Sequence, residues 1–236
     1  MKVIVVTGAT RGIGQGLAAQ FAARGHQVVT CGTTGGDVVA DVSDREQVRR
    51  VWDTAVDRHG RVDLWINNAG VTQPRLPLWE LSPAETRHVL DVNLHGVVNG
   101  CAVAIPGMAA QGHGHVWNME GLGSDGRTVP GLALYGASKR AVTYLTGALA
   151  KEVPAGVSVG LLSPGMVRTD LLLRDARPGA SRVFALLADP VETVTPWLAE
   201  QALARARNGA HVRWLTRRKI LARFALAPFT RRRTPL

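Results

Sequence analysis

The feature that most constrains the fold of this chain is the alternation of short apolar runs with longer helical stretches. The runs are bounded by Gly, Asn, Asp or Pro, as the buried strands of a parallel sheet are. They comprise residues 3–6, 27–31, 64–67, 116–119 and 157–162. Helical stretches lie between most of them, at residues 13–24, 45–59, 83–99 and 135–151. This order predicts an α/β fold with a doubly wound parallel sheet of Rossmann type, and 236 residues suit a single domain.

One connection in this pattern is unusually short. Only residues 32–37 separate the second run from a further apolar run at 38–40. Parallel neighbours are normally joined by a dozen or more residues that include a helix. Either a helix is missing here or a loop crosses without one.

Two of the helices carry sequence signals for their first residues. Ser43 or Asp44 can cap the helix at 45–59. Ser82 followed by Pro83 fits the N-cap and the first helical position of the next one.

The cysteines and the apolar stretches of the sequence indicate in which cellular compartment the protein resides. The two cysteines, Cys31 and Cys101, lie far apart and outside any CxxC pattern, which argues against a disulfide framework and fits a reducing compartment. The apolar run after Met1 is too short for a signal peptide, and the uncharged stretch 92–119 contains too many polar residues and glycines for a membrane span. We therefore expect a cytoplasmic protein.

The net charge of +10 is confined to the C-terminal part of the chain. Residues 1–200 hold 18 basic and 18 acidic side chains, and every excess cation follows Glu200. The sequence thus predicts a domain at 1–214 and a basic amphipathic tail at 215–236.

The tail has the pattern of an amphipathic helix. Ile220, Leu221 and Phe224 fall on one helical face, whereas the cations lie mostly away from it. These cations are Arg218, Lys219 and Arg223, followed by Arg231, Arg232 and Arg233. Such a helix can lie on an anionic membrane surface, pack on a partner or cover the core. No recognition motif for a specific nucleic acid accompanies the charge.

A glycine-rich loop follows the first strand and opens the first helix. Its sequence is TGATRGIG at residues 7–14, in which Gly8, Gly12 and Gly14 permit a tight turn and close backbone approach. In that position the loop and the helix N-terminus can hold a pyrophosphate. The remaining candidate contacts in the loop are Thr10, Arg11 and Ile13.

The choice of dinucleotide depends on charges at the end of the second strand. An acidic residue there would bind a ribose 2′-hydroxyl, whereas a cation would accommodate a 2′-phosphate. Residues 31–34, including Thr33, contain no acid, and Arg11 offers a cation. We therefore favour NADP(H) over NAD(H), with Asp37 keeping the NAD(H) alternative open.

These motifs together resemble those of the short-chain dehydrogenase/reductase family. The resemblance rests on TGATRGIG at 7–14, NNAG at 67–70, Asn93 in DVNLHG, YGASK at 135–139 and PGMVRT at 164–169. Five motifs in family order cover most of the chain. The resemblance implies a nicotinamide-dependent oxidoreductase that assembles as a homodimer or homotetramer and binds a small-molecule substrate.

Tyr135 and Lys139 are the candidate catalytic pair. Four residues apart on a helix, they share a face, and a lysine ammonium beside a phenol lowers the phenol pKa. Tyr135 then becomes a usable acid or base near neutral pH. The family resemblance implies that Lys139 also holds the nicotinamide ribose and that Asn93 helps carry a water-linked proton path.

The resemblance implies further cofactor contacts along the carboxyl edge of the sheet. Asp41 and Val42 fall where the family contacts adenine, although Asp41 could equally cap the next helix. The other implied contacts are Asn68, Ala69, Gly70, Pro164, Gly165, Val167 and Thr169.

The chain departs from the family pattern at the catalytic serine. The usual strand ends Asn-Ile-Ser-Ser, with the second serine 13 residues before the tyrosine; here the strand ends NMEG at 118–121, and the thirteenth residue before Tyr135 is Leu122. Ser124 is the nearest hydroxyl, and Glu120 adjoins the expected site. A neutral Glu120 in an apolar pocket could donate a hydrogen bond to substrate, whereas a solvent-facing or salt-bridged Glu120 could not.

The run NMEGLGSDGR at 118–127 is similar to the subgroup that contains the chlorophyll(ide) b reductases, which reduce a formyl group. We therefore expect an NADPH-dependent reductase of an aldehyde or ketone, or of an imine, on a sizeable apolar or ring-containing substrate. The alternative is a nucleotide-binding regulator or scaffold that has lost efficient catalysis. His113 and His115 lack a third ligand nearby, so we expect no metal site.

Overall fold

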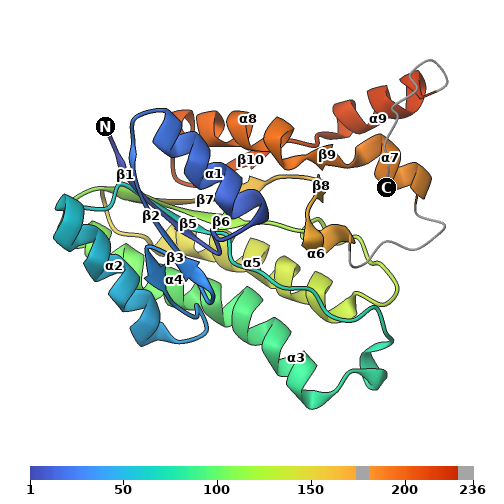
Figure 1. Cartoon of the computed structure of the whole chain (residues 1–236), viewed down its shortest axis with the longest axis horizontal. Helices are drawn as coiled ribbons and strands as arrows, with labels where there is room; N and C mark the ends of the chain where they lie inside the picture. Colours follow the sequence, from blue (N-terminus) through green and yellow to red (C-terminus); the bar gives the residue numbers. More distant parts are fainter. Residues whose placement is uncertain (174–180, 228–236) are drawn as a thin grey trace.

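A seven-stranded parallel sheet forms the centre of the molecule (Figure 1). The computed structural model describes residues 1–173 and 181–227. The strand order is β10-β7-β6-β5-β1-β2-β4, and every neighbouring pair is parallel. The strands are β1 Val3–Thr7, β2 Gln27–Gly32, β4 Val38–Val39, β5 Leu64–Asn67, β6 Gly114–Met119, β7 Val157–Ser163 and β10 Ala210–Arg213. The predicted Rossmann-type sheet in a single domain is therefore confirmed.

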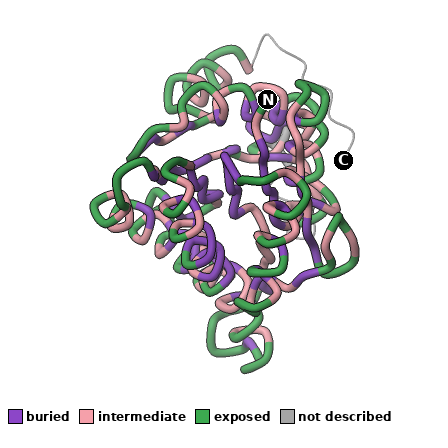
Figure 2. The backbone as a smooth tube through the Cα atoms, turned by 90° about the vertical axis from the view of Figure 1, so that its left-hand side faces the viewer, coloured by how far each residue is buried: buried purple, intermediate pink, exposed green. Residues whose placement is uncertain are grey.

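Helices cover both faces of the sheet, as the alternation in sequence requires. The helices α1 (Gly12–Ala23) and α8 (Val191–Ala204) lie on one face, and the helices α2 (Arg45–His59), α4 (Gly96–Ala110) and α5 (Ala133–Glu152) on the other (Figure 1). Side chains alternate between the faces along each strand. Because both faces are covered, the strands are buried nearly throughout, whereas the outer sides of the helices are exposed (Figure 2).

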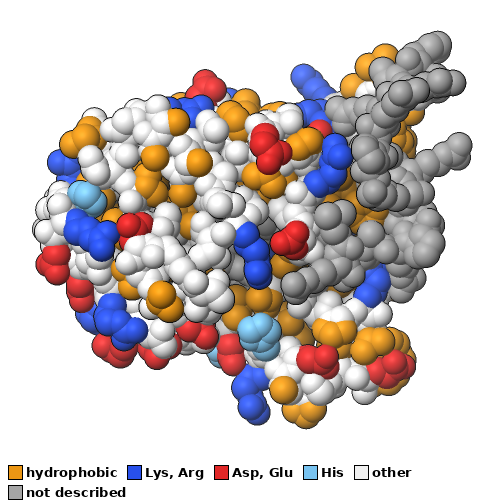
Figure 3. Space-filling model, viewed as in Figure 1, with side chains coloured by type: hydrophobic (Ala, Val, Ile, Leu, Met, Phe, Trp, Pro, Cys, Tyr) orange, Lys and Arg blue, Asp and Glu red, His pale blue; other side chains and the backbone are white. Residues whose placement is uncertain are grey.

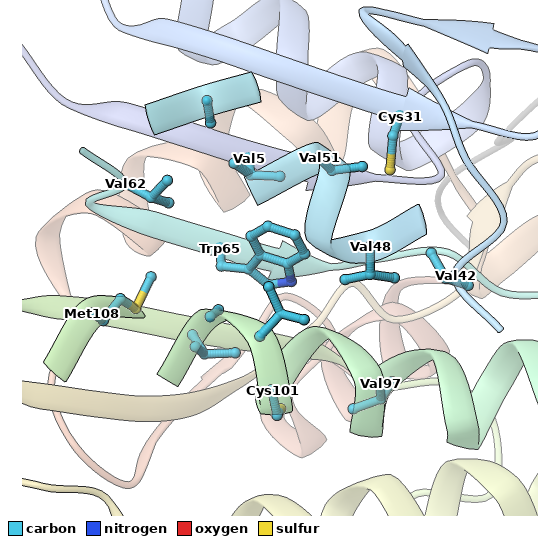
Figure 4. Packing of buried hydrophobic residues seen from close by; sticks show 14 of the residues in the cluster. Val5, Cys31, Val42, Val48, Val51, Val62, Trp65, Val97, Cys101 and Met108 are labelled. Atoms are coloured by element: carbon cyan, nitrogen blue, oxygen red, sulfur yellow. The ribbon is translucent and has the colours of Figure 1, made fainter. Parts of the chain in front are cut away.

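Trp65 anchors the core on the α2 and α4 side. It lies fully buried between α2, which contributes Val48 and Val51, and α4, which contributes Val97 and Cys101 (Figure 4). Over the outer surface of α2, acidic and basic side chains are interspersed (Figure 3), in keeping with the balanced charge of residues 1–200.

The short connection after β2 is a loop that crosses without a helix. The two-residue strand β3 (Gly35–Gly36) leads directly to β4, which still pairs parallel with β2. Gly36 has φ 103°, a backbone conformation that favours glycine. The second of the two alternatives for this link is therefore the observed one.

The predicted helix starts agree with the observed caps. Asp44 accepts hydrogen bonds from the backbone N–H groups of Glu46 and Gln47, and Ser82 forms a capping box with Glu85 at the start of α3 (Pro83–Leu90). The helix α2 has the predicted bounds.

The prediction that the third helix ends at Asn99 is wrong. After α3, the π-helical turn η2 (Asp91–His95) joins directly to α4, which continues through Pro106 to Ala110. Asn99 does not end the helix because its buried side-chain amide donates to the carbonyl oxygens of Val42 and Ser43. By length and composition the helical stretch 83–110 could cross a membrane, but half of its most apolar window is buried within the domain, as in a core helix.

Several elements after β7 were not anticipated from sequence. They are β8 (Val167–Arg168), α6 (Asp170–Leu173), α7 (Ser181–Leu187), β9 (Asp189–Pro190), α8 and β10. Earlier in the chain, the 3-10 turn η1 (Leu78–Glu80) precedes α3. The helix α8 carries Pro196 in its interior, which masked it in the sequence.

The basic tail begins as the helix α9 (Arg217–Leu226), whose N-cap Thr216 accepts from the backbone N–H of Lys219. Arg223 points into the domain: its side chain is 10% exposed and its guanidinium lies 2.6 Å from Asp189. The Lys219 ammonium lies 3.0 Å from the ring centroid of Trp214. Leu221 is 70% exposed, so the apolar face of α9 remains largely open. Arg231, Arg232 and Arg233 lie outside the described residues.

Candidate active site

The glycine loop and the NNAG segment form one hydrogen-bonded unit at the carboxyl edge of the sheet. The Thr7 hydroxyl accepts from the backbone N–H groups of Asn68 and Ala69, and the Asn68 side-chain amide donates to the carbonyl oxygens of Thr7 and Gly8. Gly8 has φ 62°, and a Cβ there would lie 2.6 Å from the Ala69 Cα. Only glycine permits this approach.

Two further predicted segments meet the glycine loop. A Cβ on Gly12 would lie 3.3 Å from Thr169 Cγ2, so the loop that contains Pro164, Gly165 and Val167 reaches the start of α1. Thr10 packs over the end of β2, because a Cβ on Gly32 would lie 2.7 Å from its Cγ2. The exposed Arg11 is the N-cap of α1 and leaves the first amide groups of the helix without a side-chain cap. We call the glycine loop with the start of α1 the glycine-loop cradle; helix N-termini of this kind can bind a phosphate group.

The acidic side chain nearest the end of β2 is already engaged. Asp37 Oδ2 accepts hydrogen bonds from the backbone and side chain of Thr30, and Arg58 lies 3.1 Å from Oδ1. Although partial burial alone would raise it, these contacts hold the pKa of Asp37 below its ordinary value. The exposed Thr33 lies before this turn and carries no charge.

Asp41 and Val42 lie between β4 and α2. The Asp41 carboxylate accepts from the backbone and hydroxyl of Ser43, whereas Asp44 caps α2, so Asp41 is not the helix cap. Val42 is buried against Gly96, where an added Cβ would lie 2.6 Å from Val42 Cγ2.

Asn93 is fixed inside the π-helical turn η2, fully buried. Its Oδ1 accepts from the Val71 N–H at 2.8 Å, and its Nδ2 donates to Val71 O and to the Ser138 hydroxyl. A Cβ on Gly70 would lie 3.3 Å from Asn93 Oδ1 and 3.4 Å from Lys139 Nζ. Asn93 and Lys139 therefore converge beside the NNAG segment.

Tyr135 and Lys139 converge on Gly121, just beyond the end of β6. A Cβ on Gly121 would lie 2.5 Å from the Tyr135 hydroxyl oxygen and 3.1 Å from Lys139 Cγ. The Lys139 Nζ donates to Met119 O at 3.4 Å. Burial lowers the pKa of Lys139 to about 8, against the opposing effect of the Glu120 charge.

The residue that faces the tyrosine hydroxyl is thus Gly121. Ser124 and Glu120, the two candidates to replace the missing serine, both have their side chains engaged elsewhere. The Ser124 hydroxyl accepts from the Gly121 N–H and donates to Lys139 O, so it closes a turn. Leu122, the thirteenth residue before Tyr135, is 39% exposed.

Glu120 adopts the salt-bridged arrangement and not that of a neutral donor. Its Oε2 lies 2.7 Å from His211 Nε2, and Thr143 donates to Oε1 at 3.1 Å. Although burial alone would raise it, the contact with His211 and the hydroxyl donors hold the pKa of Glu120 below its ordinary value. The neutral form that could donate to substrate is therefore disfavoured, which corrects that expectation.

Sequence reasoning missed four residues of this site: Gln73, Gly121, Thr143 and His211. Gln73 is 1% exposed and accepts from the backbone N–H of Tyr135, so it fixes the first turn of α5. No local signal marks Gln73 or His211, because their partners are 62 and 91 residues away. In the described parts of the chain, no three His, Cys, Asp or Glu side chains form a group that could hold a metal ion.

Comparison with known proteins identifies what this chain resembles. Residues 2–177 match the family model described as short chain dehydrogenase. The chain is 35% identical to chlorophyll(ide) b reductase NOL, chloroplastic, of Oryza sativa subsp. japonica, over 98% of this chain and 76% of that protein. It is 33% identical to the NADPH-dependent pterin aldehyde reductase of Arabidopsis thaliana, over 72% of this chain and 77% of that protein.

Solved structures agree with the fold. The 3-ketoacyl-(acyl-carrier-protein) reductase from Brucella melitensis, complexed with NADH, superimposes with a TM-score of 0.79 at 28% identity, covering 90% of this chain and 96% of that one. The resemblance inferred from the five motifs, including that to the chlorophyll(ide) b reductases, is therefore confirmed.

Proposed function

This chain belongs to the short-chain dehydrogenase family, and on that basis we propose that it is an NADPH-dependent reductase of an aldehyde or ketone, or of an imine, carried by a sizeable apolar or ring-containing substrate. The observation that carries this proposal is the convergence of Tyr135 and Lys139 on Gly121, beside the glycine-loop cradle. A nicotinamide dinucleotide bound in that cradle would supply hydride to the substrate carbon.

The residues of the chain have separate tasks in this reaction. Tyr135 donates a proton to the substrate oxygen, and Lys139 stabilises the resulting phenolate by its charge. Lys139 also holds the nicotinamide ribose, and Asn93 links the site to water. Because Gly121 has no side chain, no Cβ collides with the Tyr135 hydroxyl oxygen.

In this proposal a dinucleotide would extend from the cradle along the carboxyl edge of the sheet. Glycines 8, 12 and 14 admit the pyrophosphate, Asp41 and Val42 bound the adenine end, and Thr169 closes over the nicotinamide end. Arg11 and Thr33 would face the adenosine ribose. Two features support a 2′-phosphate there: Arg11 is exposed, and the Asp37 carboxylate is committed to Thr30 and Arg58.

The names of the relatives and the surface near the site support the substrate class. One similar protein is named chlorophyll(ide) b reductase and another NADPH-dependent pterin aldehyde reductase, and both names denote ring-containing substrates. Leu122, next to Gly121, is 39% exposed, and Leu171 in α6 is 36% exposed. Leu122 offers apolar contact next to Gly121, and Leu171 offers it two residues after Thr169, at the proposed nicotinamide end.

The alternative is a nucleotide-binding regulator or scaffold, favoured by the replacement of the serine. Asn93 and Lys139 meet beside Gly70, and Tyr135 and Lys139 meet beside Gly121. The grouping of these three side chains favours catalysis.

We further propose that the chain acts as a homodimer or homotetramer in the cytoplasm, and that α9 can touch an anionic membrane surface. The region after Glu200 contains ten cations and no acid, and Leu221 and Phe224 are exposed on α9. Sedimentation with vesicles tests this contact: the chain should sediment with anionic vesicles and not with neutral ones. Equal recovery with both would contradict it.

The test of the proposed reaction is NADPH oxidation with a panel of ring aldehydes that includes a pterin aldehyde and chlorophyllide b. At least one should be reduced, and Tyr135→Phe should lower turnover by about 10² to 10⁴ while NADPH binding persists. Tyr144→Phe is the matched control, because Tyr144 is 80% exposed on the same helix and lies outside the site. NADPH binding without reduction of any aldehyde would favour the regulator, and full activity of Tyr135→Phe would remove the proton donor from the account.

A further inference from the structure

Glu120 has a buried carboxylate to which the proposed reaction assigns no task. The residue is 7% exposed at the end of β6. Both of its oxygens have partners: Oε2 lies 2.7 Å from His211 Nε2, and Oε1 accepts from Thr143 at 3.1 Å. Ser163 contributes another hydrogen bond. A carboxylate with this many donors is held in its charged form.

The buried ammonium of Lys139 contacts the same backbone segment. Its Nζ donates to Met119 O, the carbonyl immediately before Glu120. Thr143, one helical turn after Lys139, has its hydroxyl 3.1 Å from Glu120 Oε1 and 3.2 Å from Lys139 O. The ammonium thus bonds the residue next to Glu120, and Thr143 links the Glu120 carboxylate to the backbone of Lys139.

A buried ammonium with a single carbonyl acceptor tends to lose its proton, because desolvation penalises the charged form. Lys139 is 4% exposed, and the one acidic group in the described structure that supports its charge is Glu120. The other ionisable groups that face the pair are Tyr135 on α5, and His211 with Arg213 on β10.

We propose that the carboxylate of Glu120, anchored by His211 and Thr143, is the counter-charge that keeps the buried ammonium of Lys139 protonated. Glu120 is then a positioning residue, which acts on Tyr135 through Lys139 and does not touch substrate. The catalytic part of this inference rests on the proposed function, whereas the electrostatic part does not.

The same strand end holds Gly121, opposite the tyrosine, and Glu120. Gly121 stands where a side chain would collide with the Tyr135 hydroxyl, and the charged residue next to it faces away, toward His211.

The sign of the expected effect follows from the charges. Burial lowers the pKa of Lys139 to about 8, and the negative Glu120 opposes this decrease. Removing the charge by Glu120→Gln should lower that pKa further, so Lys139 would lose its proton at a lower pH. The alkaline limb of turnover should then move to lower pH, because the neutral amine no longer stabilises the Tyr135 phenolate.

The direct test is a pH titration of the lysine side chains by NMR. The chain contains four lysines, namely Lys2, Lys139, Lys151 and Lys219, so isotope-labelled lysine gives a spectrum with few signals, and Lys139→Met assigns the one of interest. In the unaltered protein Lys139 should titrate near pH 8. In Glu120→Gln its midpoint should fall by about one unit or more, a tenfold loss of proton affinity, while the other three lysines stay in place.

Glu120→Asp is the matched control because it disturbs the packing but keeps the carboxylate. Its Lys139 midpoint should move by less than half as much. An unchanged midpoint in Glu120→Gln, or an equal shift in Glu120→Asp, would overturn the proposal. So would an uncharged Lys139 at neutral pH in the unaltered protein, a result that does not depend on whether the variants fold. The titration needs no substrate, so it distinguishes this inference from a failure of the proposed reaction.

Discussion

Gly121→Ala is the most informative single substitution, because it adds one methyl group against the proposed proton donor. The new Cβ would lie 2.5 Å from the Tyr135 hydroxyl oxygen. Ordinary contacts need about 3.5 Å, so the hydroxyl must move by roughly 1 Å. A displacement of that size in a catalytic group costs about 10²-fold in rate. The Gly121 backbone is not in the left-handed region, so alanine can adopt its backbone conformation without strain. The effect of the substitution is therefore the steric contact with the tyrosine.

The assay is turnover of NADPH with an accepted aldehyde, together with the NADPH dissociation constant from fluorescence. Turnover should fall about 10²-fold with little change in NADPH affinity. Gly147→Ala is the matched control: it lies in α5, where an added Cβ has no atom within 4 Å, and a helical Gly-to-Ala change should raise stability by about 0.5 to 1 kcal/mol. If Gly121→Ala works as well as Gly147→Ala, the position of the tyrosine hydroxyl does not control the reaction.

Two further predictions concern the cofactor and the docking of the tail helix. NADPH should bind about tenfold more tightly than NADH, roughly 1.4 kcal/mol, and Arg11→Ala should remove the difference; equal affinities in the unaltered chain, measured by fluorescence, would count against the 2′-phosphate. Arg223→Ala should lower the free energy of unfolding by about 3 kcal/mol at neutral pH, because it removes the guanidinium that lies 2.6 Å from the buried Asp189 carboxylate. Burial alone would raise the pKa of Asp189, but Trp214 and Arg223 hold it below its ordinary value, so this stability is present at neutral pH and is lost below about pH 4. Denaturant unfolding at both pH values checks this, and a difference that persists in acid would contradict the assignment to the ion pair.

The parts of the fold that sequence predicted are those encoded by neighbouring residues. Asp44 and Ser82 act on amide groups two or three positions away, so the pattern of residues contains the whole interaction. The glycine loop is similar, because its glycines and the following helix are adjacent in the chain. The faces of the strands follow from a period of two residues.

The parts that sequence missed depend on partners far along the chain. Asn99 looks like a polar helix end until Val42 and Ser43 accept its amide protons. Arg223 looks like a solvated cation until Asp189 lies beside it. The sequence allowed Glu120 to be either a neutral hydrogen-bond donor or a salt-bridged carboxylate, and the difference depends on whether it has a charged partner. That partner, His211, lies two strands away in the sheet. Such pairings follow from the strand order, which local patterns do not contain.

The central claim, a dinucleotide cradle that leads to Tyr135, is tested most directly by a crystal structure of the chain with NADPH and a substrate carbonyl analogue. The account predicts the pyrophosphate at residues 8–14 and the adenine beside Asp41 and Val42. It also predicts one carbonyl group within about 3.5 Å of both the nicotinamide ring and the Tyr135 hydroxyl. A nicotinamide ring held away from Tyr135, with another side chain on the carbonyl oxygen, would contradict it.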